Sequence, residues 1–513
     1  MTHRFISSLL LTAALTASLP AAVSLPTESS SSLPTDAEGP AKTAMDAFRA
    51  GRYSAAVELA TPLAEQGNAE AQYLLGFANE FGQGTVASRD KALEFYRKAA
   101  ANKHKDAVYR LSAMLLASEK AEERDQAREV LETAAKDDPA LAARTLGEAY
   151  LRGLLSKDPD PDKAVFWWKR ASDAGDVLSS ILLARFYEGQ FGYPEKKDLK
   201  ESLANYGKAA GLGNAGAMAA LGSRLLSGDE KNRDEKKGRE WLKKAIAAKE
   251  YTAYLVLGDY EEFVKKDLKA ALAEYERGKD AGQMDCILRT ADFYLDGKGV
   301  PKDVDRGNSL LTKAAEAGNP MANFRAAAQY LTLDKPNKSD LLMGYGCLLV
   351  AANGNLTEAQ NELGLLYISG KLGIGDFPAG VAWLTRAAQA GNAQAQFNLA
   401  ILYERGEGGV QKNLDNTAQL LALAANQGHA QATLVLAQLI NNGYGANKPD
   451  PIKAWALATL AKERGDKDAE KFAAEISAKL DDKQRADAVK ALEEIKSNKT
   501  AKKEEPKETK PVK

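Results

Sequence analysis

Histidine and cysteine are scarce in this chain of 513 residues, and their placement predicts no metal site. There are three histidines, His3, His104 and His429, and two cysteines, Cys286 and Cys347. The histidines lie far apart, with no cysteine or acidic cluster at the spacing of metal ligands. The chain also lacks the GxxxxGK[ST] phosphate loop and the Gly-x-Ser-x-Gly turn of hydrolases. We therefore expect no catalytic residue and no cofactor.

An excess of charge of one sign is also missing. The chain has 69 basic and 70 acidic residues, a net charge of −1, and the two signs are intermixed. Proteins that bind nucleic acid concentrate basic residues in a patch or stripe. Nucleic acid is therefore not an expected partner, whereas an apolar content of 45% is sufficient for a core.

Long hydrophobic runs are absent except at the N-terminus. Residues 5–19 are mostly apolar, follow His3 and Arg4, and precede small residues at Ala22 and Ser24, an arrangement typical of an export signal. The run is shorter than the roughly 20 apolar residues of a membrane-spanning helix, and no cysteine lies nearby for lipid attachment. We expect a signal peptide at 1–24, a disordered Ser/Pro-rich linker at 25–43, and a periplasmic or secreted protein with no membrane span.

A 36-residue unit, repeated eleven times between Gly67 and Gly465, dominates the rest of the chain. The repeats start at Gly67, Lys103, Pro139, Gly175, Gly213, Lys249, Gly282, Gly318, Gly354, Gly391 and Gly428. A fixed period in this range is the signature of a solenoid, in which each repeat buries its apolar face only against its neighbours. We therefore predict one repeat array over residues 67–465.

Each repeat has the pattern of two helices. In the first repeat, apolar residues at helical spacing predict helices at 69–81 and about 89–101, separated by Gly82 and Gly84. A capping residue precedes the second helix of nearly every repeat. This column is Ser88, Glu123, Asp160, Asp198, Asp234, Asp267, Asp303, Asp340, Asp376, Asn413 and Asp450. Because these residues recur once per repeat, they cannot converge on one metal ion, and we interpret them as N-caps.

Two further columns contain only small residues. In the second helix these are Ala92, Ala127, Ala164, Ser202, Gly238, Ala271, Gly307, Gly344, Gly380, Thr417 and Ala454. In the first helix they are Gly76, Ser112, Gly147, Ala184, Gly222, Gly258, Ala291, Ala327, Gly364, Ala400 and Ala437. Glycine inside a helix costs up to about 1 kcal/mol relative to alanine, so its recurrence predicts a close approach of two helix backbones. We expect the aromatic residues Tyr96, Trp168, Tyr206, Trp241, Tyr275 and Trp383 to fill the space between helix pairs.

The repeat resembles the Sel-one-like repeat (SLR) family, a longer relative of the tetratricopeptide repeat. The clearest match is TADFYLDGKGVPKDVDRGNSLLTKAAEAGNP at 290–320, with Gly297, Gly299, Val300 and Asp303 in the family's positions. The resemblance implies an all-α fold, a right-handed α/α superhelix of about eleven helix-turn-helix repeats. The repeats starting near Lys103, Lys249 and Gly318 have altered loops, which suggests local changes in curvature.

Both ends of the array carry candidate caps. Residues 44–66 form a half-repeat whose Phe48 and Tyr53 we expect to pack on the first repeat. Residues 466–497 are expected to form a C-terminal capping helix. Residues 498–513 contain charges of both signs and two prolines, which predicts a disordered, solvated tail.

The two cysteines occupy repeat positions that do not require a thiol. Cys286 aligns with alanines such as Ala71, and Cys347 with aromatic residues such as Trp383. A disulfide would have to join a first helix to the second helix of the next repeat, and its Cα atoms would have to lie within about 7 Å. We favour two buried thiols and keep the disulfide as the alternative.

Membership of the SLR family would imply a non-catalytic scaffold that binds protein partners, in a cell-envelope complex for an exported chain. In related helical repeats the first helices line the concave surface and grip the partner. By position this nominates Tyr73, Phe77, Glu80, Leu365, Phe397, Ile401 and Arg405 as partner-binding residues. The sequence predicts neither the partner nor the oligomeric state.

Two alternatives come from other functional classes. Secreted SLR relatives rich in cysteine have been linked to penicillin-type ligands and β-lactam hydrolysis, but they carry a cysteine pair in each repeat, whereas this chain has two cysteines in all. Glycan binding would predict several exposed tryptophans. The five present, Trp167, Trp168, Trp241, Trp383 and Trp455, lie mainly on core columns.

Overall fold

The computed structural model describes residues 39–228, 233–333, 337–370, 375–407 and 409–501. Within these ranges the regular structure is helical, apart from one isolated β-bridge between Tyr444 and Asn447. The predicted all-α solenoid of SLR-type repeats is therefore confirmed. The chain divides into two compact units, residues 1–260 and 261–513. The predicted signal peptide, most of the linker, and residues 502–513 of the tail lie outside the described residues.

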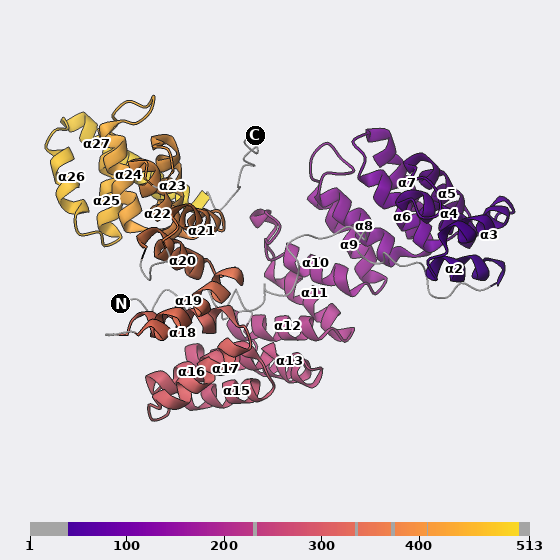
Figure 1. Ribbon diagram of the computed structural model, residues 1–513, viewed down its shortest axis with the longest axis horizontal. Helices are drawn as coiled ribbons and strands as arrows, with labels where there is room; N and C mark the ends of the chain where they lie inside the picture. The colour runs from indigo at the N-terminus through magenta and orange to yellow at the C-terminus, as the bar shows by residue number, and fades with distance from the viewer. Residues whose placement is uncertain (1–38, 229–232, 334–336, 371–374, 408, 502–513) are drawn as a thin grey trace. The chain divides into compact units, whose positions relative to one another are not determined.

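The first unit contains five complete helix pairs behind an N-terminal cap (Figure 1). Its elements are η1 (Gly39–Ala41), α2 (Lys42–Arg49), α3 (Tyr53–Glu65), α4 (Ala69–Phe81), α5 (Arg89–Ala101), α6 (Lys105–Leu116), α7 (Ala121–Asp137), α8 (Pro139–Leu151), α9 (Pro161–Asp173), α10 (Val177–Phe186), η2 (Pro194–Lys196), α11 (Leu199–Gly211), α12 (Ala215–Ser227), α13 (Glu235–Ala247) and α14 (Thr252–Asp259). Even-numbered helices from α4 onward are first helices, and odd-numbered ones are second helices.

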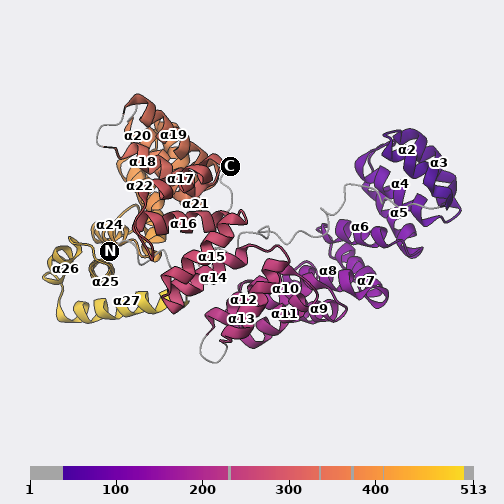
Figure 2. The ribbon, with the colours of Figure 1, turned by 90° about the horizontal axis from the view of Figure 1, so that it is seen from below.

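The second unit continues this order and ends in two additional helices (Figure 2). Its elements are α15 (Leu268–Asp280), α16 (Met284–Asp296), α17 (Val304–Glu316), α18 (Pro320–Leu331), α19 (Lys338–Asn353), α20 (Thr357–Ser369), α21 (Phe377–Gln389), α22 (Ala393–Arg405), α23 (Leu414–Asn426), α24 (Ala430–Asn442), α25 (Pro451–Glu463), α26 (Ala469–Ser477) and α27 (Asp482–Ala501). The π-helix η3 (Tyr260–Lys265) lies at the boundary of the two units, in the repeat that lacks the Gly-x-Gly loop.

The column of capping residues acts largely as predicted. Nine members accept a hydrogen bond from a backbone N–H in the first turn of the second helix: Ser88, Asp160, Asp198, Asp234, Asp267, Asp303, Asp376, Asn413 and Asp450. The other two predictions were wrong. Glu123 lies inside α7, which begins two residues earlier. Asp340 is the third residue of α19, and it forms a reciprocal capping box with the N-cap Asn337.

The small-residue columns bring the two helices of a repeat into close contact. All members of both columns are buried. A Cβ atom built on Gly364 would lie 3.0 Å from the carbonyl oxygen of Gly380, and one built on Gly380 would lie 2.8 Å from that of Gly364. Gly222 and Gly238 face each other in the same way, at 2.9 and 3.1 Å. The predicted close approach of backbones is therefore present in both units.

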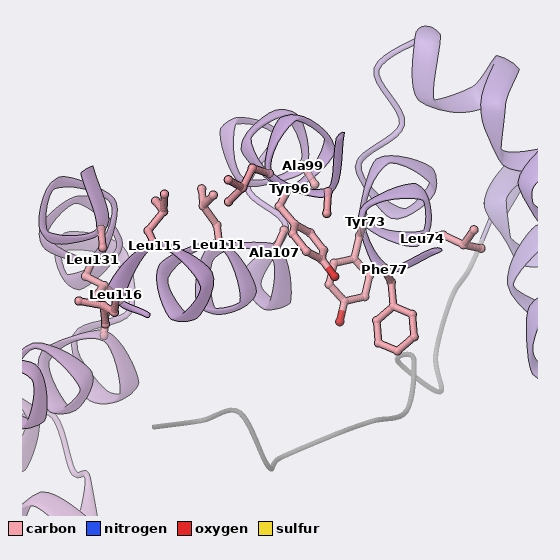
Figure 3. Close-up of a cluster of buried hydrophobic side chains, with 14 of the residues drawn as sticks. Tyr73, Leu74, Phe77, Tyr96, Ala99, Ala107, Leu111, Leu115, Leu116 and Leu131 are labelled. Carbon is pink, nitrogen blue, oxygen red and sulfur yellow. The ribbon is translucent and has the colours of Figure 1, made fainter. Parts of the chain in front are cut away.

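One residue of each second helix, four positions after the small residue, fills the space that this contact leaves. The column is Tyr96, Leu131, Trp168, Tyr206, Leu242, Tyr275, Leu311, Leu348, Leu384, Leu421 and Ala458, and every member is buried. Figure 3 shows Tyr96 beside Tyr73 of the first helix, with ring centroids 5.7 Å apart. Trp241 and Trp383 precede this column by one position. They are half-buried and pack against the core clusters of α10–α12 and α18–α20, so they fill space between helix pairs as predicted.

Neither Cys286 nor Cys347 is part of a disulfide in the described part of the chain. Cys286 is buried in α16, as expected. Cys347 is only half-buried, because it occupies the same half-exposed position in α19 that Trp383 occupies in α21. The prediction of two buried thiols is therefore correct for the first cysteine alone.

The ends of the array differ from prediction in extent. Helix α2 begins at Lys42, inside the segment predicted as linker, and Phe48 packs edge-on against Phe77 of α4. At the C-terminus the chain forms two helices instead of one. Asp481 and Gln484 accept each other's backbone N–H groups at 3.1 and 2.8 Å, which starts α27 after a break. Helix α27 continues to Ala501, so the first residues of the predicted tail are helical.

A single added methyl group in the helix contact should destabilise a repeat. In Gly380→Ala, the new Cβ would lie 2.6 Å from Ile368 Cγ1 and 2.8 Å from the Gly364 oxygen. Overpacking of this kind costs about 1–3 kcal/mol, which exceeds the gain of up to about 1 kcal/mol from replacing a helical glycine. We expect faster amide hydrogen exchange in α20 and α21 and a lower melting temperature.

Gly346→Ala in α19 is the matched control, because no atom lies within 4 Å of its Cβ position. This variant should be neutral or slightly stabilised. Destabilisation of both variants to the same extent would contradict the assignment of Gly380 to a backbone contact.

Candidate protein-binding surfaces

Three of the seven residues predicted to bind a partner are buried in the core, so their side chains are not available for binding. The exposed fractions of Tyr73, Phe77 and Phe397 are 1%, 4% and 8%. Histidines at the start of the next first helix cover two of them: the His104 ring stacks on Tyr73 at 4.4 Å, and the His429 ring stacks on Phe397 at 5.0 Å. Both histidines also cap the helices that follow them: Nδ1 of each ring accepts a hydrogen bond from the backbone N–H of the third helical residue.

A fourth nominated residue, Glu80, is half-buried and already bonded within the repeats. Its carboxylate accepts the Tyr96 hydroxyl at 2.6 Å and lies 3.6 Å from Arg110. Burial raises the pKa of Tyr96 above its ordinary value, with the negative charge of Glu80 as the second cause. The Arg110 guanidinium also lies 5.3 Å from the Phe77 ring, so Glu80 belongs to a contact between repeats.

The Glu80–Tyr96 pair is one of three equivalent pairs. A glutamate four residues after the small residue of the first helix accepts the tyrosine hydroxyl from the second helix. The pairs are Glu80–Tyr96, Glu188–Tyr206 and Glu262–Tyr275, at 2.6, 3.3 and 2.9 Å. In four repeats with leucine in the second helix, the glutamate position is also leucine: Leu116, Leu226, Leu295 and Leu331. A buried hydroxyl requires an acceptor, so the two positions vary together along the chain.

The repeat of α22 and α23 departs from this rule, and this places one more residue on the candidate surface. Glu404 occupies the glutamate position of α22, but its second-helix counterpart is Leu421, which has no hydroxyl. Glu404 is half-exposed and lies next to the exposed Arg405. The nominated residues Leu365 and Ile401 are half-exposed on α20 and α22. These four residues form the first-helix surface of the second unit, and their role in binding stays a prediction.

A second candidate surface lies on α19 and was missed from the sequence. Leu342, Met343, Gly346 and Val350 share one face of this helix, hereafter the α19 apolar face. The exposed fractions of its three apolar side chains are 58%, 52% and 45%. Contiguous exposed apolar patches are found at interaction sites, whereas single exposed apolar residues are common, so this face is a candidate surface.

The positions of Leu342, Met343 and Val350 carry charges in most other second helices. In α5 they hold Asp90, Lys91 and Lys98. The position of Val350 is a lysine or arginine in seven repeats: Lys98, Arg170, Lys208, Lys244, Arg277, Lys313 and Arg386. This difference between apolar and charged residues is visible in the sequence once the repeats are aligned by their small residues. Only the exposed fractions show that no other helix of the unit covers the α19 apolar face.

The described residues offer no sign of metal chemistry and no membrane span. They contain no group of three or more histidine, cysteine, aspartate or glutamate side chains arranged to hold a metal ion. None of the helices in the described ranges is long and apolar enough to cross a bilayer.

Comparison with known proteins identifies the repeat. The sequence pattern of the Sel1 repeat matches residues 69–104, 140–176, 178–214, 215–249, 285–319, 357–392, 393–429 and 430–466. The chain belongs to the Sel1 repeat family. The unmatched stretches hold three further repeats, α6–α7, α14–α15 and α18–α19, and the α19 apolar face belongs to the last of them.

Relatives of this Sel1 repeat chain occur in bacteria and fungi. A protein of Neisseria meningitidis is 24% identical over 388 residues, which cover 71% of this chain and 78% of the relative. A chitin synthase regulator of Saccharomyces cerevisiae is 28% identical over 236 residues, 43% of this chain and 34% of the relative. Among solved structures, a protective antigen of uropathogenic Escherichia coli with an SLR fold is 23% identical, with a TM-score of 0.46 and coverage of 89% and 99%.

His429 should make the stability of the protein fall as the pH drops below 6.5. Burial lowers its pKa below the ordinary value of 6.5, so the unfolded chain takes up the proton first. Stability is therefore retained above pH 6.5 and lost as the pH falls toward the lowered pKa of the folded state. Protonation at Nδ1 also removes the acceptor for the Ala432 N–H. His429→Asn, which keeps a cap of the kind that Asn392 provides, should weaken this pH dependence.

The measurement is thermal unfolding of both proteins above and below pH 6.5. His429→Ala serves as the comparison, because loss of the cap should cost about 1 kcal/mol at neutral pH. An unchanged pH dependence in His429→Asn would show that other groups cause it.

Proposed function

We propose that this protein is a non-catalytic scaffold that binds protein partners outside the cytoplasm, in a complex of the cell envelope. Sel1 repeat proteins generally mediate protein–protein interactions. The observation that carries the proposal is the α19 apolar face, where three apolar side chains stand exposed at positions that are charged in most other repeats. Burial of apolar side chains at an interface contributes favourable binding free energy. The charged side chains that other repeats carry at these positions are depleted from the centres of protein interfaces.

The first-helix surface of the second unit supports the proposal as an additional contact. Leu365 and Ile401 offer apolar area, and Glu404 and Arg405 offer charges of both signs beside it. Arg405 lies 3.8 Å from the Glu407 carboxylate, and its side chain is 61% exposed. An apolar centre with a charged rim is the usual composition of a protein interface.

Charges placed on the α19 apolar face should abolish partner binding without unfolding the chain. The variant L342D/M343K/V350K introduces the residue types that α5 carries at these positions, Asp90, Lys91 and Lys98. We expect chemical crosslinking in producing cells, followed by mass spectrometry, to recover a partner with the wild type and at least tenfold less of it with the variant.

Phe166→Lys is the control, because Phe166 is 54% exposed on α9, in the other unit. It should leave the crosslinked partner in place. Equal recovery with the triple variant would exclude this face as the binding site, and clear turnover of a chromogenic β-lactam by the purified chain would exclude a purely non-catalytic role.

The proposed export can be tested by determining the N-terminus of the protein recovered from cells. If residues 1–24 are a signal peptide, the protein recovered from the producing cell should begin near Ala22 to Ser24 and appear outside the cytoplasm. Intact-mass measurement of the recovered protein reads the new terminus directly. A chain that keeps Met1 and stays in the cytoplasm would contradict this part of the proposal.

A further inference from the structure

The helices α5, α6 and α7 line an open pocket of about 620 Å³ in the first unit. The three helices are labelled in Figure 2. The walls are mainly apolar: Ala100 comes from α5, Val108 and Leu111 from α6, and Val130 and Ala134 from α7. The volume lies in the range that accepts a small molecule or a few side chains.

The neighbouring repeats show what is missing from this pocket. The position of Val130 is aromatic in four other second helices: Phe95, Trp167, Trp241 and Trp383. Trp167 is only 9% exposed, and the other three side chains are half-buried. Trp241 of α13 packs against a cluster that includes α11 and α12, and Trp383 of α21 packs against one that includes α19 and α20. By repeat equivalence, a ring at the position of Val130 would face α5 and α6, where the pocket lies.

A cation accompanies each of the four aromatic rings. Three residues after each ring stands a lysine or arginine whose charged group lies 4.1 to 5.6 Å from the ring centroid. In α7 the corresponding residue is Thr133, so the ring and its cation are both absent. Arg97, Lys103 and Lys105 line the pocket instead and place positive charge at its edge.

We propose that this pocket binds an aromatic side chain, tryptophan above all, of a partner polypeptide. The ring would take the place that Phe95 and Trp167 fill in their own repeats, between apolar walls and within reach of a cation. Glu129, Asp137 and Asp138 also line the pocket, and Asp138 pairs with Lys105 at 3.2 Å. Because the edge carries both signs of charge, an uncharged peptide around the ring fits it.

The occupant's polypeptide nature rests on the proposed function, whereas the aromatic site rests on the pocket alone. The test uses the full chain and the peptide acetyl-Gly-(5-fluoro-Trp)-Gly-amide, followed by fluorine NMR. We expect the wild type to broaden the peptide signal in a saturable way. Val130→Trp should weaken binding at least tenfold and leave the melting temperature unchanged or raised, because α9, α13 and α21 already accommodate tryptophan at this position.

A second variant keeps the test valid if Val130→Trp fails to fold. Ala101 lines the pocket and is exposed, and its equivalent in α7 is Lys136, so Ala101→Lys should fold and still crowd the site. Ala247→Lys makes the same change at the equivalent exposed position of α13 and should leave binding intact.

Three results would overturn the proposal: no saturable broadening by the wild type, equal binding by Val130→Trp and Ala101→Lys, or binding of decanoate in place of the peptide. The peptide measurement involves no cellular partner. A failure here therefore leaves the scaffold function standing, and loss of a partner from the α19 variant leaves the pocket standing.

Discussion

Close contact between the two helices of each repeat is the constraint on which the rest of the structure depends. Small residues such as Gly364 and Gly380 let the backbones approach until a Cβ atom no longer fits between them. In ten of the eleven second helices a larger residue then fills the remaining space, as Leu384 does in that repeat. Because every repeat makes this contact within itself, the array needs no central core, and each repeat packs only against its neighbours.

The two proposed binding sites both involve repeats that depart from the regular pattern. The pocket lies between α5 and the α6–α7 repeat, and the apolar face lies on α19. The α6–α7 and α18–α19 repeats both lie outside the segments that match the Sel1 pattern. In one case an aromatic side chain is replaced by Val130 and a hollow remains. In the other, charged positions are occupied by Leu342, Met343 and Val350. The helices persist in both because the small residues and buried columns are kept.

The nominated binding residues show where reasoning from position fails. Tyr73 and Phe397 occupy first-helix positions that related repeats use for binding, but the capping histidines of the next repeats stack on them. Both histidines were visible in the sequence as isolated residues without a metal role. Their stacking could not be read from the sequence, because it depends on a ring 31 or 32 residues earlier lying beside the capping histidine.

The sequence by itself determined the repeat, its two helices and most of its caps, because these depend on spacing and on contacts a few residues apart. The predicted helices of the first repeat, 69–81 and 89–101, coincide with α4 and α5. Only the tertiary structure decided which apolar residues remain exposed. Exposure is set by neighbouring repeats, where one side chain such as His104 covers a ring and a smaller one such as Val130 leaves space.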